Sequence, residues 1–207
     1  GSPNFLNNIG GRITSILLNF ILIRVGGEAA VSVYGILMYA EGFIQPLLYG
    51  MCDSLQPAVG FNWGAGQFRR VAAIERCCYT ASGLLSLTAA AVLFLFPGEV
   101  GQLFVGASGS ELLTMAEGAL RLFALTYLTR WFSFATQSYM LAVEKSLAAA
   151  AISVSTALLF PVILLGLLWP FGLTGIWLNF AVTSLLAGIL AGAILARFQK
   201  KEVKNMA

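Results

Sequence analysis

Long apolar stretches, each about 20 residues or more, recur along the whole chain with little polar sequence between them. A helix that crosses the hydrocarbon core of a bilayer needs about 20 mainly apolar residues, so each stretch is long enough to span a membrane. The sequence therefore predicts an all-α membrane protein in which residues 1–207 form a single lobe of six transmembrane helices. The predicted helices cover about residues 5–25, 29–62, 67–96, 111–143, 146–169 and 174–198.

The composition and the chemistry-bearing residues exclude several classes of protein. Charged residues make up only 10% of the chain and apolar residues 58%, whereas water-soluble domains carry about 25% charged residues. The net charge of +3 comes from loops and the tail, and no basic stripe with interleaved aromatic residues suggests a nucleic-acid partner. The chain has no histidine, and no carboxylate pair or Ser-Lys dyad has helical spacing within the membrane zone. We therefore expect a lipid-embedded protein that is not an enzyme, with no metal and no cofactor.

Basic residues follow apolar stretches at three separate places, and such residues mark the cytoplasmic side of a membrane. Arg69 and Arg70 follow the second predicted helix, Lys145 follows the fourth, and the tail 197–204 follows the sixth. The connection over 97–110 carries no basic residue and is predicted to be an outer loop. This pattern predicts a multi-pass protein of the cell (plasma or inner) membrane with both termini in the cytoplasm.

The end of the second predicted helix carries a motif of spaced residues. In order these are Gln56, Pro57, Gly60, Asn62, Trp63, Gly64 and Ala65. Residues 1–5, the pair at 26–27 and the stretch 172–177 supply supporting marks in the same order along the chain. The sequence resembles the second lobe of MATE (multidrug and toxic compound extrusion) transporters, over essentially its whole length.

That resemblance implies a protein of two six-helix lobes, so that the partner of this chain is either a missing N-terminal lobe or a second copy of the chain. It implies a cavity between the lobes, alternating access, and export of amphipathic or cationic organic compounds against Na⁺ or H⁺. Na⁺-linked members carry acidic residues in the first and fourth helices of this lobe. Here the first helix has none, and Glu117 lies near the outer end of the fourth. We therefore expect coupling by a proton site in the first lobe or by Glu41.

Polar and aromatic residues recur at helical spacing in the first, second and fourth predicted helices, and each set falls on one face. A charge in hydrocarbon costs at least about 2.5–3.5 kcal/mol, so these faces should contact protein or water. We expect the three faces to converge on one cavity for a substrate or an ion, because rings give contact area and polar groups fix orientation. The candidate cavity residues are Asn8, Arg12, Asn19, Tyr34, Glu41, Gln45, Tyr49, Tyr127, Arg130 and Gln137.

Glu41 is the only acidic residue that the sequence places well inside the apolar zone, roughly level with Arg12 and Arg130. One interpretation is a site for a substrate cation or a proton. The other is a structural ion pair with Arg12 or Arg130 that holds two helices together. Glu117 and Arg121, one helical turn apart, are expected to pair with each other.

A second group of residues is predicted to let the lobe bend. Pro46 and Pro57 should kink the second helix, because proline removes a helical hydrogen bond. Gly64 and Gly66 free the backbone to turn at the membrane surface, and Gln56 precedes the turn. We expect these residues to form a cytoplasmic gate or elbow rather than the substrate site.

Two alternative functions stay open from the sequence. The first is a flippase for lipids or lipid-linked oligosaccharides, in which Arg12 and Arg130 would hold a pyrophosphate. The second is a membrane module of half size that assembles or regulates and does not transport. In each case the partners are the lipid bilayer and another lobe, with a small organic substrate for the transporters.

Overall fold

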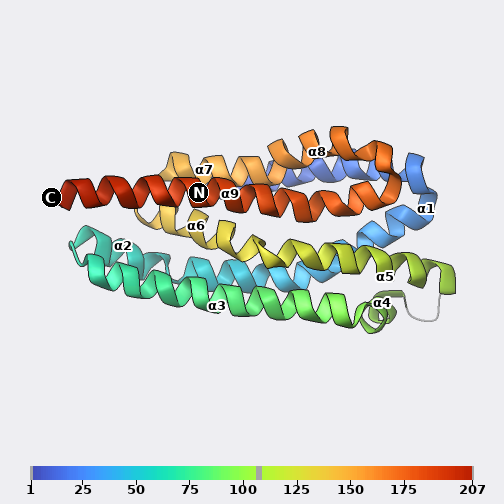
Figure 1. The fold of residues 1–207 in the computed structure, drawn as a ribbon, viewed down its shortest axis with the longest axis horizontal. Coiled ribbons are helices and arrows are strands. Elements are labelled where there is room, and N and C mark those ends of the chain that lie inside the picture. Colours follow the sequence, from blue (N-terminus) through green and yellow to red (C-terminus); the bar gives the residue numbers. More distant parts are fainter. Residues whose placement is uncertain (1, 106–108, 207) are drawn as a thin grey trace.

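The chain begins as one long helix that reverses direction at a glycine. The computed structural model describes residues 2–105 and 109–206. Helix α1, Ser2–Ser54, has helical backbone angles except at Gly27, where φ is 69° and ψ is −159°. Glycine has no Cβ and adopts this conformation without strain. The two parts of α1 therefore run in opposite directions (Figure 1), and the reversal lies between the predicted helices 5–25 and 29–62.

The elbow motif ends α1 and turns the chain toward the next helix. Helix α2, Gln56–Gly64, begins with Pro57 in its first turn, where a missing backbone N–H costs nothing. Gly66 then has a φ of +72° and leads into α3, Phe68–Leu95. Pro46 does not interrupt α1, whose backbone stays helical to Ser54. The break in this region is thus at Leu55 and not at Pro46.

The region predicted as an outer loop and a fourth helix is divided into shorter elements. Helix α4, Pro97–Val105, lies inside the predicted loop over 97–110, and its first turn holds a proline and the acidic Glu99 that favour a helix start. The predicted helix 111–143 is split by a 3₁₀ turn, because the backbone at Thr129 leaves the helical region with φ −123° and ψ −17°. The elements here are α5 (Ser110–Ala124), η1 (Leu125–Leu128) and α6 (Arg130–Ala142).

The last part of the chain forms a second interrupted helical hairpin. A π-helical turn, η2, divides the predicted helix 146–169 just before Pro161, the residue expected to kink it. Gly172, with a φ of 71°, reverses the chain into the last helix. The elements are α7 (Ser146–Val154), η2 (Ser155–Leu159), α8 (Phe160–Leu168), η3 (Trp169–Phe171) and α9 (Gly172–Met206).

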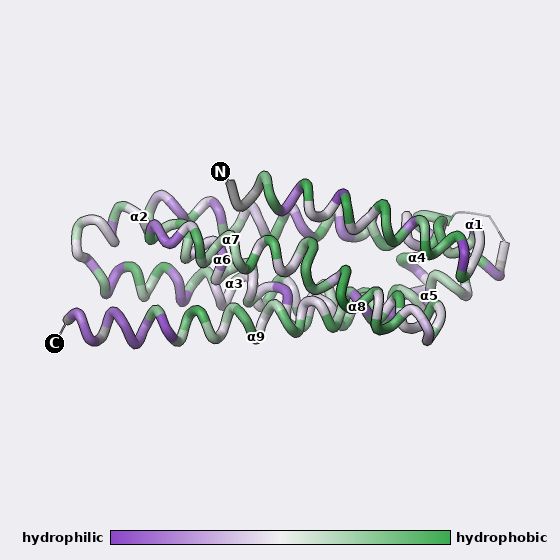
Figure 2. The backbone as a smooth tube through the Cα atoms, turned by 90° about the horizontal axis from the view of Figure 1, so that it is seen from above, coloured by the Kyte–Doolittle hydropathy of each residue, from purple (hydrophilic) through white to green (hydrophobic). Residues whose placement is uncertain are grey.

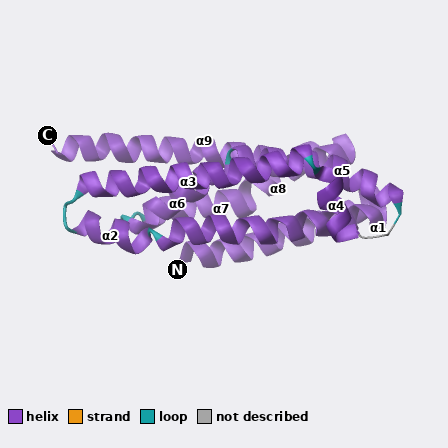
Figure 3. Ribbon diagram, turned by 90° about the horizontal axis from the view of Figure 1, so that it is seen from below, coloured by secondary structure: helices purple, strands orange, loops and turns teal. Residues whose placement is uncertain are grey.

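The long helices lie side by side along one axis, and α4 packs across the end of the bundle against α5 and α3 (Figures 1 and 3). Helix α9 packs along α5, α6 and α8. Hydrophilic residues gather toward the end that carries α2 and the C-terminal part of α9, and hydrophobic residues dominate along the shaft (Figure 2). The described part of the chain contains no β-strand.

The outer surface of the bundle is apolar, as a lipid environment requires. Large side chains such as Phe20, Phe43 and Leu167 are more than half exposed, while the core is closed by residues such as Leu37 and Phe123 that are fully buried. Three helical runs among the described residues are long and apolar enough to cross a membrane. They are Phe5–Gly64, Phe68–Leu95 and Ser146–Glu202.

Candidate functional site

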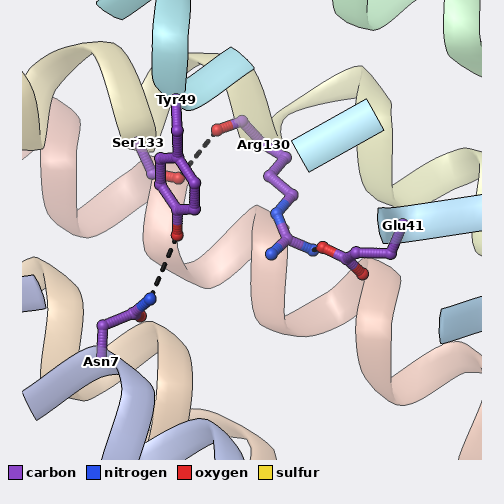
Figure 4. Close-up of polar contacts among 5 residues, drawn as sticks. All are labelled: Asn7, Glu41, Tyr49, Arg130 and Ser133. Carbon is purple, nitrogen blue, oxygen red and sulfur yellow. Dashed lines mark hydrogen bonds and ion pairs between the residues drawn. The ribbon is translucent and has the colours of Figure 1, made fainter. Parts of the chain in front are cut away.

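A buried ion pair joins α1 to α6 near the middle of the bundle. Arg130 Nη1 lies 2.5 Å from Glu41 Oε1, and the two side chains are 15% and 10% exposed. Figure 4 shows the guanidinium of Arg130 pointing at the carboxylate of Glu41. The guanidinium also lies over the ring of Phe134, with Cζ 5.0 Å from the ring centroid. A pair this well shielded from water interacts strongly, and removing one partner would strand the other charge.

The 3₁₀ turn before α6 brings Arg130 to this position. A helix break frees backbone carbonyls that must find other donors. Ser86 Oγ donates to the carbonyl of Tyr127 at 2.5 Å, and Trp131 Nε1 donates to that of Leu128 at 2.9 Å. These contacts stabilise the break, which makes Arg130 the first residue of α6.

The ion pair borders a cavity of about 190 Å³ between both parts of α1 and the η2, α8 and α9 segments. Its walls carry hydroxyl, amide and charged groups beside aliphatic and aromatic ones. The polar lining residues are Asn7, Thr14, Tyr34, Glu41, Gln45, Arg130, Thr156, Asn179, Thr183 and Ser184. A hollow with a few convergent polar groups in apolar walls is the usual form of a small-molecule or ion site.

The π-helical turn η2 forms one wall of this cavity. A π-turn is rare and often occurs at functional sites, because it displaces backbone carbonyls from the regular helical pattern. Thr14 Oγ1 donates to the carbonyl of Ala157 at 2.6 Å, and Asn179 Nδ2 donates to that of Pro161 at 3.0 Å. Thr183 Oγ1 in turn donates to Asn179 Oδ1 at 3.0 Å. These residues therefore hold α1 and α9 against the interrupted helix as well as lining the space.

Aromatic rings close another side of the cavity. The ring of Tyr34 stacks on Phe180 with centroids 6.1 Å apart, and its hydroxyl donates to Ser15 Oγ at 3.0 Å. Phe123 packs edge-on against Phe180 from behind, at 5.4 Å. The cavity thus offers an aromatic face, an ion pair and several hydrogen-bonding groups in one place.

Four of the sequence-predicted residues meet at this cavity: Tyr34, Glu41, Gln45 and Arg130. Two more, Asn8 and Tyr49, line a second cavity of about 220 Å³ together with Asn7 and Asp53. Asn7 borders both spaces and donates from Nδ2 to Tyr49 Oη at 3.1 Å (Figure 4).

Arg12 and Asn19 lie apart from the other predicted residues, on the exposed side of α1. Both are exposed, and neither lines the two cavities described above. The rotation of α1 is set by Gly10, where a Cβ would lie 3.2 Å from the Cβ atoms of Ala157 and Leu158. This close packing turns Asn7 and Thr14 inward in place of the predicted stripe.

Tyr127 and Gln137 are buried in the packing rather than in the cavity lining. Tyr127 is 0% exposed and packs edge-on against Phe123, with its hydroxyl lacking a hydrogen-bond partner among the described residues. Gln137 is 7% exposed within α6. The expected pair of Glu117 with Arg121 is also absent from the described ion pairs, and Glu117 packs instead against Gly98 of α4.

The predicted elbow residues form a polar joint between α1, α2 and α6. Gln56 Nε2 donates to Asp53 Oδ1 at 2.8 Å and to Ser138 Oγ at 3.0 Å. Ser138 Oγ donates to the carbonyl of Cys52 at 3.1 Å, close to the break at Leu55. At Gly60 a Cβ would lie 3.2 Å from the carbonyl oxygen of Ala142, so glycine permits the close approach of α2 to the end of α6.

Sequence reasoning missed one buried acidic residue and most of the π-helical wall. Glu75 of α3 is 6% exposed, and its Oε2 has no hydrogen-bond partner among the described residues. The expectation that Glu41 is the only acidic residue inside the apolar zone is therefore wrong, because Glu75 is buried although it directly precedes the exposed Arg76. Asn7 and Thr156 had no clear signal in the sequence, because only the packing of α1 on η2 brings them to the cavity.

Comparison with known families decides what kind of molecule carries this cavity. The family model for MatE matches residues 3–167. The chain belongs to the MatE family. MatE proteins are multi-pass membrane transporters and not enzymes. Comparison with curated protein sequences finds no match.

Solved MATE structures share this fold at low sequence identity. An outward-facing multidrug resistance MATE family transporter of the MOP superfamily is 19% identical, with a TM-score of 0.88 over 99% of this chain and 46% of that one. A MOP superfamily transporter from Pyrococcus furiosus, described by the reverse polarity of its binding pocket, is 18% identical with the same TM-score and the same coverage. A MATE protein in the straight conformation is 19% identical, again with a TM-score of 0.88 over 99% of this chain and 46% of that one. The chain thus spans about half the length of the transporters it matches, with the fold of one half.

Proposed function

We propose that this chain is the second lobe of a two-lobed antiporter that exports amphipathic or cationic organic compounds in exchange for H⁺ or Na⁺. The observation that carries the proposal is the Glu41–Arg130 pair at the border of a partly aromatic cavity. A cation or a proton that reaches Glu41 must compete with Arg130 for the carboxylate. Its binding therefore changes the contact between α1 and α6.

Such a competition is a physical route from binding to movement. A ligand shifts a conformational equilibrium only through contacts that differ between the two conformations. Neutralising Glu41 leaves Arg130 without its partner. The conformation that contains the Glu41–Arg130 ion pair then loses stability relative to a conformation that lacks this pair. The π-turn η2 with Pro161, and the break at Leu55, are the places where the backbone already departs from regular helix. They favour rocking of the lobe as the movement that follows.

The exposed polar side of α1 supports the presence of another lobe. Arg12, Asn8 and Asn19 are exposed in this chain, within the mainly apolar first part of α1. A charge facing hydrocarbon costs at least about 2.5–3.5 kcal/mol, so this side should face protein or a water-filled space. A missing N-terminal lobe or a second copy of the chain would supply both.

The flippase alternative has weaker support. It needs two arginines free to hold a pyrophosphate, and the charge of Arg130 is compensated by Glu41. Arg12 is exposed and does not line the cavity. The remaining hydroxyl and amide groups fit a neutral or cationic ligand better than a doubly charged anion.

The test replaces Glu41 by Gln in the complete two-lobed protein, reconstituted in liposomes with a fluorescent cationic dye and an imposed pH or Na⁺ gradient. We expect the gradient-driven efflux to fall at least tenfold, because an amide carries no exchangeable charge. The matched control is Glu99→Gln, an exposed carboxylate in the first turn of α4, which should keep the activity of the unmodified protein.

Efflux by Glu41→Gln that equals that of the control, with the same dependence on the gradient, would contradict the coupling role of Glu41. Competition of dye efflux by lipid-linked sugars, but not by a second cationic dye, would favour the flippase. If the unmodified protein neither transports nor binds the dye, the result would favour a membrane module that does not transport.

A further inference from the structure

We propose that a basic cleft at the C-terminal end of α9 binds the phosphate headgroup of an anionic phospholipid. The cleft has a volume of about 520 Å³ and lies where α9 passes the connection between α6 and α7. Five of the 12 Lys and Arg residues of the chain line it, and no acidic side chain does. These basic residues are Lys145, Arg197, Lys200, Lys201 and Lys204.

The spacing of these residues concentrates positive charge on one side of α9. Positions 197, 200, 201 and 204 follow one another at intervals of three, one and three residues, which places them on the same helical face. Lys145 approaches this face from the α6–α7 connection. Like charges so close on one helix repel each other, and none of the five forms an ion pair with a described acidic residue. Glu144 and Glu202 lie close in sequence, and two negative charges do not balance five positive ones. The cleft therefore carries an excess of positive charge that attracts an anion.

The floor of the cleft indicates a lipid rather than a free anion. Met140, Ile194 and Phe198 form an apolar base beneath the basic rim. The outer surface beside it is apolar as well, since Leu147 at the start of α7 is 86% exposed. A dissolved phosphate gains nothing from such a floor, whereas the glycerol and the first acyl carbons of a phospholipid can lie on it.

The position along the bundle fits a headgroup at the membrane surface. In Figure 2 the hydrophobic part of α9 passes into its hydrophilic C-terminal part at the end of the bundle that also carries α2. Basic pockets between transmembrane helices at such a boundary bind the headgroups of anionic lipids. A lipid held here would contact α9 and the α6–α7 connection together.

The test measures lipid binding to the intact protein in a neutral detergent by native mass spectrometry. The probes are phosphatidylglycerol and phosphatidylcholine with the same acyl chains. The cleft variant combines Arg197→Gln, Lys200→Gln and Lys201→Gln. The control variant combines Arg69→Gln, Arg70→Gln and Arg76→Gln, which removes three exposed positive charges near the same end of the bundle. We expect the cleft variant to bind phosphatidylglycerol at least tenfold more weakly, and the control variant to change less than twofold.

Three results would overturn the proposal. The first is equal binding of the two lipids to the unmodified protein. The second is an equal loss in the cleft and control variants, which would mean a diffuse charge effect. The third is displacement of phosphatidylglycerol by millimolar inorganic phosphate, which would mean a site for the free anion. If the triple variant is not stably folded, the single variants Lys145→Gln and Lys201→Gln replace it, and each should weaken phosphatidylglycerol binding severalfold against Arg69→Gln.

Discussion

Breaking the ion pair between Glu41 and Arg130 should strongly destabilise the protein. The pair is 2.5 Å long, and its side chains are only 15% and 10% exposed, so the remaining partner cannot reach bulk water freely. Removing one member of a buried pair costs about 3–5 kcal/mol. The 190 Å³ cavity beside the pair admits some hydration, so we expect the lower end of that range for Glu41→Gln and for Arg130→Gln.

This cost can be expressed as a melting temperature. For proteins of 150–250 residues, 1 kcal/mol corresponds to about 2–4 °C, so each single variant should melt roughly 6–12 °C lower at the lower end of the range. The double variant Glu41→Gln with Arg130→Gln should recover part of this loss, because two amides can bond to each other and no charge is stranded. The measurement is thermal unfolding of the intact protein in one detergent, followed by tryptophan fluorescence.

The control for this cycle is Arg121→Gln, an exposed arginine with no ion pair among the described residues, which should melt within about 1–2 °C of the unmodified protein. The reasoning is refuted if the two single losses add up in the double variant, since coupling between contacting groups appears as non-additivity. It is also refuted if both single variants melt together with the control.

Two further substitutions test the packing around the cavity and the elbow by the same melting assay. Gly60→Val should cost about 1–3 kcal/mol, because even a Cβ there would lie 3.2 Å from the carbonyl oxygen of Ala142, whereas Gly64→Ala meets open space and should change stability little. Equal melting of these two variants would contradict the close approach of α2 to α6. Asn179→Leu should lower the stability by about 1–3 kcal/mol, because it removes the 3.0 Å hydrogen bond to the carbonyl of Pro161. If this variant is as stable as the unmodified protein, the hydrogen bond does not hold α9 against α8.

Several parts of the fold are predictable from the sequence because they depend on local chemistry. The glycines at 27, 66 and 172 adopt positive φ and reverse the chain close to where the apolar stretches end. Pro57 was expected to kink one helix over 29–62, and the structure instead ends α1 at Ser54 and begins α2 at Gln56, because proline fits the first turn of a helix. The breaks at η1 and η2 are less predictable, because they are stabilised by partners distant in sequence such as Ser86 and Thr14.

The candidate site divides in the same way. The spacing along the second part of α1 predicts one shared face for Tyr34, Glu41 and Gln45, and all three line the same cavity in the structure, because a continuous helix preserves the face. The sequence did not distinguish Arg12 from Arg130 as the ion-pair partner of Glu41. The packing of α1 on α6 brings Arg130 to Glu41. The region of α4 was predicted to be part of an outer loop. A helix of nine residues is too short to span a membrane, so the length of apolar stretches does not reveal it.

The sequence by itself determined that the protein is embedded in a membrane and that an acidic residue lies inside the apolar zone. It also determined the places at which the chain reverses between helices. Only the tertiary structure decided which way each helix faces. The physical reason is that lipid and protein core are both apolar, so hydropathy does not distinguish the outer face of a transmembrane helix from its inner face. The contact of Gly10 with Ala157 and Leu158 makes that choice for the first part of α1. This contact turns Arg12 outward, and Glu41 forms its ion pair with Arg130.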